Sequence, residues 1–324
     1  MKAATMLALV SGTLACLAPP ARPLVCSSVV EGCSCGGIGC PCADDGRCDE
    51  GSCNEDSDTC VLEAEGMVYV PAGAFWMGCR EGFDTDEVTG PCPIDELPYR
   101  QVTLDAYWID QLEVGKGEYR ACMDAGVCTV PYLWDQEHYE GPVGEGMFVA
   151  GPESFPAASI SWTQASDYCE WVGKRLPTEA EWEKAARGGD GRKYPWGSEV
   201  PTCEDANYGT VGESCEYEVQ YITLTPRGLF PAGSSPFGAQ DMAGNVNEWT
   251  TDGMETGIGY GSLPTENPTG IESDNGRALR GGGYQSAILA AGGYVLRTSL
   301  RRHGLISWTA LTLDHGFRCA KDAD

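Results

Sequence analysis

The stretch that organises this chain lies at residues 173–189 and reads Gly-Lys-Arg-Leu-Pro-Thr-Glu-Ala-Glu-Trp-Glu-Lys-Ala-Ala-Arg-Gly-Gly. The Thr178 hydroxyl can accept a hydrogen bond from the backbone N–H of Glu181, and the Glu181 carboxylate can reach back to the N–H of Thr178. This reciprocal cap predicts that a helix starts at Thr178. The helix is expected to end at Gly188 and Gly189, because glycine adopts a left-handed backbone at little cost.

A second helix is predicted immediately upstream, where Ser161 and Gln164 repeat the same capping pattern. The apolar residues of one helical face then follow at spacings of three, four and seven: Ala165, Tyr168, Cys169 and Val172. The sequence therefore predicts two helices in series, with Cys169 directed toward the core.

Three further motifs follow in order. They read Asp-Met-Ala-Gly-Asn-Val-Asn-Glu-Trp at 241–249, Arg-Gly-Gly-Gly-Tyr at 280–284 and Gly-Phe-Arg-Cys-Ala at 316–320. With residues 173–189, they resemble the motifs of the formylglycine-generating enzyme family of sulfatase-modifying factors, over roughly Gly66 to Lys321. The resemblance implies an α+β fold related to C-type lectins, with unusually little regular secondary structure.

The start of this domain also looks like the family's opening run. Short apolar segments predict strands at residues 67–71, 74–78, 101–104 and 106–109. Glu113 and Val114 lead into a predicted helix that extends through Cys122. The family tends to have Thr-Asn after this Glu-Val pair, whereas this chain has Gly115 and Lys116.

Length and composition fit one large domain with an appendage. The chain has 324 residues, 42% of them hydrophobic, and no internal apolar run long enough to span a bilayer. Its formal charge of −27 repels phosphate backbones and anionic lipid surfaces, and it attracts divalent cations. Nucleic acid is therefore excluded as an expected partner.

Seventeen cysteines favour an oxidising compartment, because most would remain free thiols in a reducing cytosol. Residues 1–15 have the charge, apolar length and small terminal residues of a signal peptide. Residues 13–16 approach the lipoprotein cleavage pattern, but the large aliphatic residue lies two places before Cys16 rather than three. We expect an exported protein, whether periplasmic, extracellular or a cell-envelope lipoprotein anchored at Cys16.

Residues 16–25 are expected to form an extended tether because they contain three prolines. Residues 26–61 form a predicted Cys-rich segment, with eight cysteines between Cys26 and Cys60 and few aliphatic residues. Disulfides are favoured over zinc there, because two Cys-x-Cys pairs leave only one residue between candidate ligands. The family-like domain is predicted over residues 66–322.

Disulfides are also expected within the domain. Cys122 and Cys128 could close a small loop after the first helix. In the family, the cysteine equivalent to Cys169 pairs with that of the terminal Gly-Phe-Arg-Cys, which is Cys319 here. A loop of 150 residues closed in this way contributes on the order of 4 to 5 kcal/mol in the chain-entropy model. The resemblance places a second family disulfide at Ala186 and about Thr298, where this chain has no cysteine.

The resemblance also implies calcium. The family holds one ion with a side-chain oxygen, two backbone carbonyls and a carboxylate, which fall here on Asp241, Gly244, Val246 and Glu248. The alternative is that Glu248 caps local backbone N–H groups while Trp249 fills the core. A second, weaker calcium position would involve Asn207 and the carbonyl of Tyr208.

The family's catalytic run is Gly-Gly-Ser-x-x-Cys-x-x-x-x-Cys, which binds copper and the substrate thiol. The corresponding run here is Gly-Gly-Gly-Tyr-Gln-Ser-Ala-Ile-Leu-Ala-Ala at 281–291, so the matching positions are Gly283, Ser286 and Ala291. No cysteine occurs between Cys215 and Cys319. Because thiolates select Cu(I), copper is not expected.

Other functional groups near the C-terminus carry two interpretations each. Non-haem iron would need two of the three histidines, His138, His303 and His315, and His303 and His315 are the candidate pair. Arg297 and Arg301, with His303, could line a groove for a carboxylate, sulfate or peptide terminus. The alternative is that these arginines form internal ion pairs.

The sequence therefore predicts an exported, calcium-binding member of this family that lacks the copper centre and acts as a binding or scaffold module. The expected ligand is a protein, peptide or glycan. The alternative is an oxidoreductase that uses iron or another metal on a thiol or protein substrate. A conventional sulfatase-activating oxidase is a third interpretation, and it requires the absent cysteines.

Overall fold

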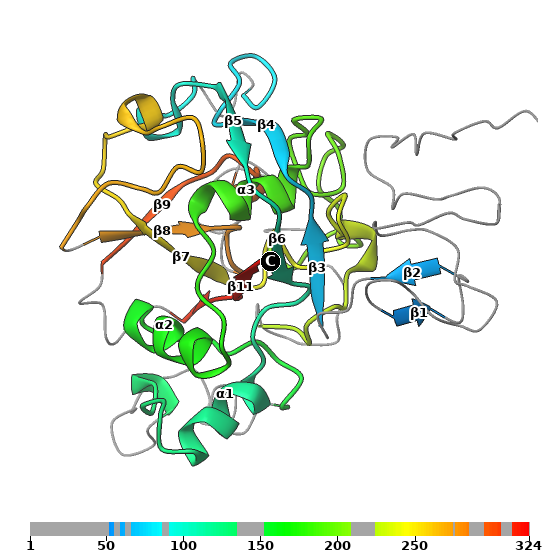
Figure 1. The fold of residues 1–324 in the computed structure, drawn as a ribbon, viewed down its shortest axis with the longest axis vertical. Helices are drawn as coiled ribbons and strands as arrows, with labels where there is room; N and C mark the ends of the chain where they lie inside the picture. Colours follow the sequence, from blue (N-terminus) through cyan, green and yellow to red (C-terminus); the bar gives the residue numbers. More distant parts are fainter. Residues whose placement is uncertain are drawn as a thin grey trace, which may run out of the picture. The chain divides into compact units, whose positions relative to one another are not determined.

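The computed structural model describes residues 52–54, 59–61, 66–85, 91–134, 152–208, 224–274, 276–284, 295–305 and 313–323 (Figure 1). The chain divides into two compact units, Met1–Glu63 and Ala64–Asp324. In the first unit, β1 (Ser52–Asn54) and β2 (Thr59–Val61) pair antiparallel, with Cys53 opposite Cys60. The predicted signal peptide, the tether, Cys16 and most of the Cys-rich segment lie outside the described residues.

Two small sheets open the second unit. β3 (Met67–Val70), β6 (Tyr107–Asp110) and β11 (Ala320–Asp322) form an antiparallel sheet of order β11-β6-β3. β4 (Gly73–Met77) and β5 (Arg100–Leu104) form an antiparallel pair. All four strands predicted in this part of the sequence are present. The C-terminal β11 completes the first sheet, so both ends of the domain meet on β6.

A third sheet carries the glycine-rich motifs. Its order is β10-β7-β8-β9, with β10 (His315–Gly316), β7 (Asn247–Gly253), β8 (Gly276–Arg280) and β9 (Arg302–Leu305). β10 runs parallel to β7, whereas the other neighbours are antiparallel. The sheet thus brings the motifs at 241–249, 280–284 and 316–320 to adjacent strands.

Three α-helices belong to the second unit in its described part: α1 (Lys116–Asp124), α2 (Trp162–Trp171) and α3 (Glu179–Arg187). Both predicted capping boxes are present, and Thr178 Oγ1 accepts from the Glu181 N–H at 3.1 Å. α3 ends at Gly188, whose φ of 72° is the left-handed conformation expected of a terminal glycine. None of the helices in the described residues is long and apolar enough to cross a lipid bilayer.

Helix α3 is buried along its whole length although most of its side chains are charged. It packs against β4, β5, β7 and β8, and Figure 1 shows it between the β4–β5 pair and the four-stranded sheet. Ion pairs and backbone contacts compensate for the burial, since buried charges require partners. Glu183 accepts from the Gly78 N–H at 2.8 Å, and Lys184 Nζ donates to the carbonyls of Pro71 and Gly73 at 2.7 and 2.9 Å. The stretch that predicted the fold therefore forms a buried helix whose charged side chains have partners inside the protein.

Disulfides crosslink the domain, and one of them joins residues that are far apart in the sequence. Cys169 of α2 is bonded to Cys319, the pairing that the family resemblance implied, and both lie in the largest apolar core. Cys122 is bonded to Cys128, as its spacing suggested. A third bridge, Cys79–Cys92, closes the loop after β4. The fold is thus α+β with little regular structure, held by crosslinks as well as by its cores.

Candidate functional site

The glycine turn after β8 contains the start of the run that the sequence resemblance matched to the family's catalytic run. Gly281 and Gly282 have φ of 86° and 73°, and the Tyr284 N–H donates to the Asn245 carbonyl at 2.8 Å. The turn is therefore fixed against the motif at 241–249. Ser286 and Ala291, the other two positions that match the catalytic run, lie outside the described residues.

Gly283 has no room for a side chain. A Cβ at this position would clash with Asp314 Oδ2 and would lie 2.9 Å from Asn247 Nδ2. Asn247 fixes Asp314 in turn, because its Nδ2 donates to Asp314 Oδ2 at 2.8 Å and its backbone N–H donates to the Asp314 carbonyl at 2.6 Å. A carboxylate thus occupies the space that a side chain at position 283 would need.

Burial raises the pKa of Asp314, while the nearby Arg302 guanidinium and the hydrogen bond from Asn247 lower it. Asn247 itself is 1% exposed, and its Oδ1 is buried without a hydrogen-bond donor in the described part of the chain. Asp314 and Asn247 therefore form a site of oxygen acceptors, in which a donor group of a ligand would be stabilised. We call Gly283, Asp314, Asn247 and Arg302 the glycine-turn site.

The structure separates the two histidines of the iron hypothesis. His303 pairs with Ala278 in β9, and His315 pairs with Asn247 in β10. These strands lie at opposite edges of the four-stranded sheet, three strand spacings or roughly 14 Å apart. Burial and Arg302 lower the pKa of His315 to about 3, so its imidazole is neutral at physiological pH. The expectation that these two histidines might meet is wrong; His138 lies outside the described residues.

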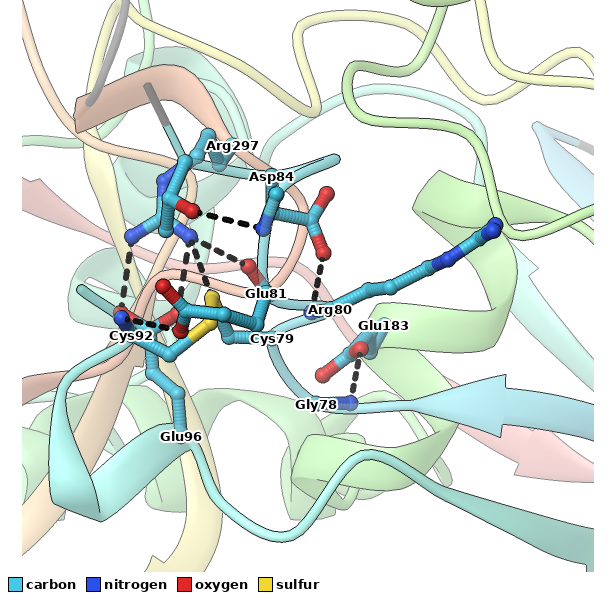
Figure 2. Close-up of a disulfide and its surroundings, with 12 residues drawn as sticks. Gly78, Cys79, Arg80, Glu81, Asp84, Cys92, Glu96, Glu183 and Arg297 are labelled. Carbon is cyan, nitrogen blue, oxygen red and sulfur yellow. Dashed lines mark hydrogen bonds and ion pairs between the residues drawn. A yellow bond between two sulfur atoms is a disulfide. The ribbon is translucent and has the colours of Figure 1, made fainter. Parts of the chain in front are cut away.

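Arg297 and Arg301 form internal ion pairs, so the ligand-groove interpretation of these residues is wrong. Arg297 is fully buried and binds both carboxylate oxygens of Glu96 at 3.0 Å (Figure 2). Arg301 is 8% exposed and binds Glu179 at 2.8 and 2.6 Å. Their partners lie more than 100 residues away in the sequence, which local reasoning could not identify. His303, the third residue of the predicted groove, is only partly buried.

Three of the predicted calcium residues, Asp241, Gly244 and Val246, lie on the turn that precedes β7, and Glu248 lies within β7. Asp241 and Asn245 have positive φ of 54° and 58°, and Asp241 Oδ2 accepts from the Gly228 N–H at 2.6 Å. Glu248 is fully buried, and its two oxygens accept from Arg318 at 2.6 and 2.7 Å. Trp182 Nε1 donates to the same carboxylate at 2.8 Å. Glu248 is therefore already engaged by protein groups.

Sequence reasoning missed Glu113 as a member of this region. It is 1% exposed, and it accepts from Asn245 Nδ2 at 2.9 Å and from the Val246 N–H at 3.3 Å. Burial raises its pKa well above the usual range, and Asp241 and Glu248 raise it further. The only signal was its place in the Glu-Val motif before α1, because its contacts lie more than 130 residues further on.

Charge balance in this region favours a cation. Arg318 faces the three carboxylates Glu113, Asp241 and Glu248, and a second guanidinium, Arg227, also acts on Asp241. Three ionised carboxylates against two guanidinium groups leave one negative charge. Burial raises the pKa of Asp241 as well. Oxygen donors of this kind suit Ca²⁺. However, no group of three or more His, Cys, Asp and Glu side chains is arranged to hold a metal ion in the described ranges.

The weaker calcium position has no carboxylate in the hydrogen bonds described around it. Asn207 Nδ2 donates to Thr225 Oγ1 and to Asn245 Oδ1, both at 3.3 Å, and the Asn207 carbonyl accepts from the Asn245 N–H at 2.7 Å. Tyr208 is buried, and its hydroxyl donates to the Pro201 carbonyl at 3.1 Å. Hydrogen bonds between protein groups thus connect this region.

The fold and the glycine turn define a formylglycine-generating-enzyme-like domain. The family model of the sulfatase-modifying factor enzyme 1-like domain matches residues 54–323, and this chain belongs to that family. It is 30% identical over 300 residues to the formylglycine-generating enzyme of Thermomonospora curvata, across 80% of this chain and 94% of that protein.

Two further relatives show how widely the fold is used. The chain is 29% identical over 256 residues to hercynine oxygenase of Mycobacterium tuberculosis, across 72% of this chain and 55% of that protein. It therefore spans about half the length of that relative. The structure of PvdO from Pseudomonas aeruginosa matches with a TM-score of 0.62 at 26% identity, across 79% of this chain and 94% of that one.

Proposed function

We propose that this chain is an exported member of the family that binds a ligand at the glycine-turn site and does not perform copper-dependent thiol oxidation. The observation that carries the proposal is the packing of Asp314 against Gly283. A carboxylate and an amide here offer hydrogen-bond acceptors, whereas Cu(I) prefers thiolates. The sequence supports this, since no cysteine lies between Cys215 and Cys319.

The chemistry of the glycine-turn site favours a ligand with exposed N–H or O–H donors. Asn247 Oδ1 and the Asp314 carboxylate are both acceptors, and a buried acceptor without a donor costs free energy that a ligand donor would recover. Peptides and glycans both carry such donors. Export to the periplasm, cell envelope or medium is part of this proposal, and the mature N-terminus, measured by mass spectrometry on protein recovered from those fractions, tests it.

Oxidase activity is the first property to measure. We expect the purified chain to leave a cysteine-containing peptide unchanged, with or without added copper, when the peptide is followed by mass spectrometry for conversion of cysteine to an aldehyde. The Thermomonospora curvata enzyme serves as the positive control under identical conditions. Copper-dependent turnover by the unmodified chain would overturn the proposal.

The relationship to an oxygenase makes iron chemistry the second candidate function. The observation that favours it is the similarity to hercynine oxygenase, although His303 and His315 lie too far apart to share one ion. Elemental analysis of protein purified without chelator or affinity metal separates the candidates. Iron at one atom per chain would support the oxygenase-like alternative, and background iron and copper would support the binding module.

Calcium binding near Asp241 is the third part of the proposal, supported by the excess of buried carboxylates. Glu113 and Asp241 would be the carboxylates that respond to the ion, because Arg318 and Trp182 already bind Glu248. Calcium at about a hundredfold its Kd should stabilise the folded chain by about 2.7 kcal/mol. Thermal unfolding of chelator-treated protein with and without calcium measures this effect.

The same experiment contains its own controls. Asp241→Asn should remove most of the calcium-dependent stabilisation, while magnesium should have a smaller effect on the unmodified chain. The raised pKa values of Glu113 and Asp241 imply that protons compete with the ion, so the calcium effect should be weaker at pH 5 than at pH 7.5. A melting temperature that calcium leaves unchanged at both pH values would contradict this part.

A further inference from the structure

The Cys79–Cys92 disulfide differs from the Cys122–Cys128 and Cys169–Cys319 disulfides in the groups that surround it. It closes a loop of sequence separation 13 after β4. Cys79 is completely buried, whereas Cys92 is 8% exposed. An incoming thiol can therefore approach Cys92 more readily than Cys79.

A guanidinium lies directly against the inner sulfur. Arg297 Nη1 donates to Cys79 Sγ at 3.3 Å, and Figure 2 shows the two groups side by side with Glu96. Glu96 binds both terminal nitrogens of Arg297 at 3.0 Å, and Ser299 Oγ accepts from Nη1 at 2.9 Å. These contacts fix the guanidinium in position against the sulfur.

We propose that Cys79–Cys92 is an exchangeable disulfide that reacts with an external dithiol through Cys92. The reagent thiolate attacks Cys92 Sγ, the S–S bond breaks, and the electron pair leaves on Cys79 Sγ as a thiolate beside Arg297. The second thiolate of the reagent then attacks the reagent sulfur of the mixed disulfide and releases Cys92. Two electrons pass to the protein, the dithiol becomes a disulfide, and both protein thiolates can take up protons.

Arg297 is what distinguishes this bridge chemically. A leaving thiolate departs faster when a positive group lowers its pKa, and Arg297 supplies that group at contact distance. Among the described residues, neither Cys122–Cys128 nor Cys169–Cys319 has a hydrogen-bond donor to sulfur. Cys128 is 7% exposed, close to the value for Cys92, so exposure alone does not separate these two bridges.

Reduction would loosen a loop that contacts helix α3. The loop carries Asp84, which is fully buried and lies 3.4 Å from Arg187 Nη2. Arg187 Nε in turn donates to Thr298 Oγ1 at 2.9 Å. Thr298 is the position at which the resemblance places the family's second disulfide. The Cys79–Cys92 bridge therefore supports the segment that the lost disulfide would have held, and its opening would loosen that support.

The test compares Cys79–Cys92 with Cys122–Cys128 and Cys169–Cys319 within one folded protein. The full chain is treated with dithiothreitol, samples are quenched with acid and alkylated, and each cysteine is followed by peptide mass spectrometry. We expect Cys79–Cys92 to open at least tenfold faster than Cys122–Cys128 and Cys169–Cys319. With glutathione, a monothiol, the trapped mixed disulfide should be on Cys92. Equal opening rates for Cys79–Cys92 and Cys122–Cys128, or a mixed disulfide mainly on Cys79, would overturn the proposal.

Two variants separate electrostatic activation from simple loosening. Glu96→Gln removes the charge that balances Arg297, so opening should become severalfold faster. Adding Arg297→Gln to that variant removes the activating charge, so opening should become slower than in the unmodified chain. Loosening of the structure would speed both variants, and that result would contradict a role for Arg297. If the double variant does not fold, the opening rates of the bridges and the cysteine that forms the mixed disulfide in the unmodified chain still test the proposal.

Discussion

Replacing Arg280 with methionine is expected to lower the free energy of unfolding by about 3–5 kcal/mol. Arg280 is 1% exposed; its Nη2 binds Glu183 at 2.6 Å, and its Nε lies 3.0 Å from Glu179. Methionine fills much of the same volume but carries no charge. The loss would therefore come from leaving Glu183 without its closest positive partner inside the protein. Urea unfolding followed by tryptophan fluorescence at pH 7 measures the change.

An exposed ion pair provides the matched control. Arg120 and Glu153 form a salt bridge in which their side chains are 40% and 54% exposed. Arg120→Met should cost less than about 1 kcal/mol, because water screens both charges. Adding Glu183→Met to Arg280→Met should recover part of the loss, since it removes the carboxylate that has lost its closest positive partner. Similar losses for Arg280→Met and Arg120→Met would show that burial does not determine the importance of these pairs.

Local sequence predicted the helices well because their caps act over three residues. Thr178 with Glu181, and Ser161 with Gln164, both form the expected reciprocal hydrogen bonds. The helix period correctly placed Cys169 in the core. These features depend on neighbours along the chain, so they could be identified before any tertiary structure was known.

The candidate site could be predicted only in part, because its decisive contacts are tertiary. Comparison with the family pattern singled out Gly283, but not the Asp314 carboxylate that packs against it. The cluster of arginines was visible in the sequence, yet the partner of Arg297, Glu96, is separated from it by 201 residues. Buried ion pairs of this kind leave no periodic signal.

The site also shows that the residues that fix the fold are separate from those of the glycine turn. Arg280 ends β8 and anchors it to α3 through Glu183, and the glycine turn follows immediately. The anchoring pair thus joins the end of β8 to the buried charged helix, whereas Gly283 lies beyond that pair in the turn. Substitutions in the turn can therefore change what the site binds without removing the ion pairs that fix β8.

Removing the Cys169–Cys319 bridge is expected to have the other largest effect on stability. Changing both cysteines to alanine should lower the free energy of unfolding by on the order of 4 to 5 kcal/mol in the chain-entropy model, because the bridge closes a loop of sequence separation 150. Both residues are fully buried, and alanine leaves no unsatisfied polar group. Urea unfolding of the double-alanine variant under non-reducing conditions measures the loss.

The Cys122–Cys128 bridge is the matched control, since its sequence separation is only 6. The same chain-entropy relation gives about 2.2 kcal/mol for so short a loop, so the long bridge should cost roughly 3 kcal/mol more to remove. Cys169 and Cys319 also join α2 to the strand end before β11, which connects the largest core to the first sheet. If the two double-alanine variants lost equal stability, loop length would not govern the contribution of these bridges, and strain or packing at each bridge would have to explain it.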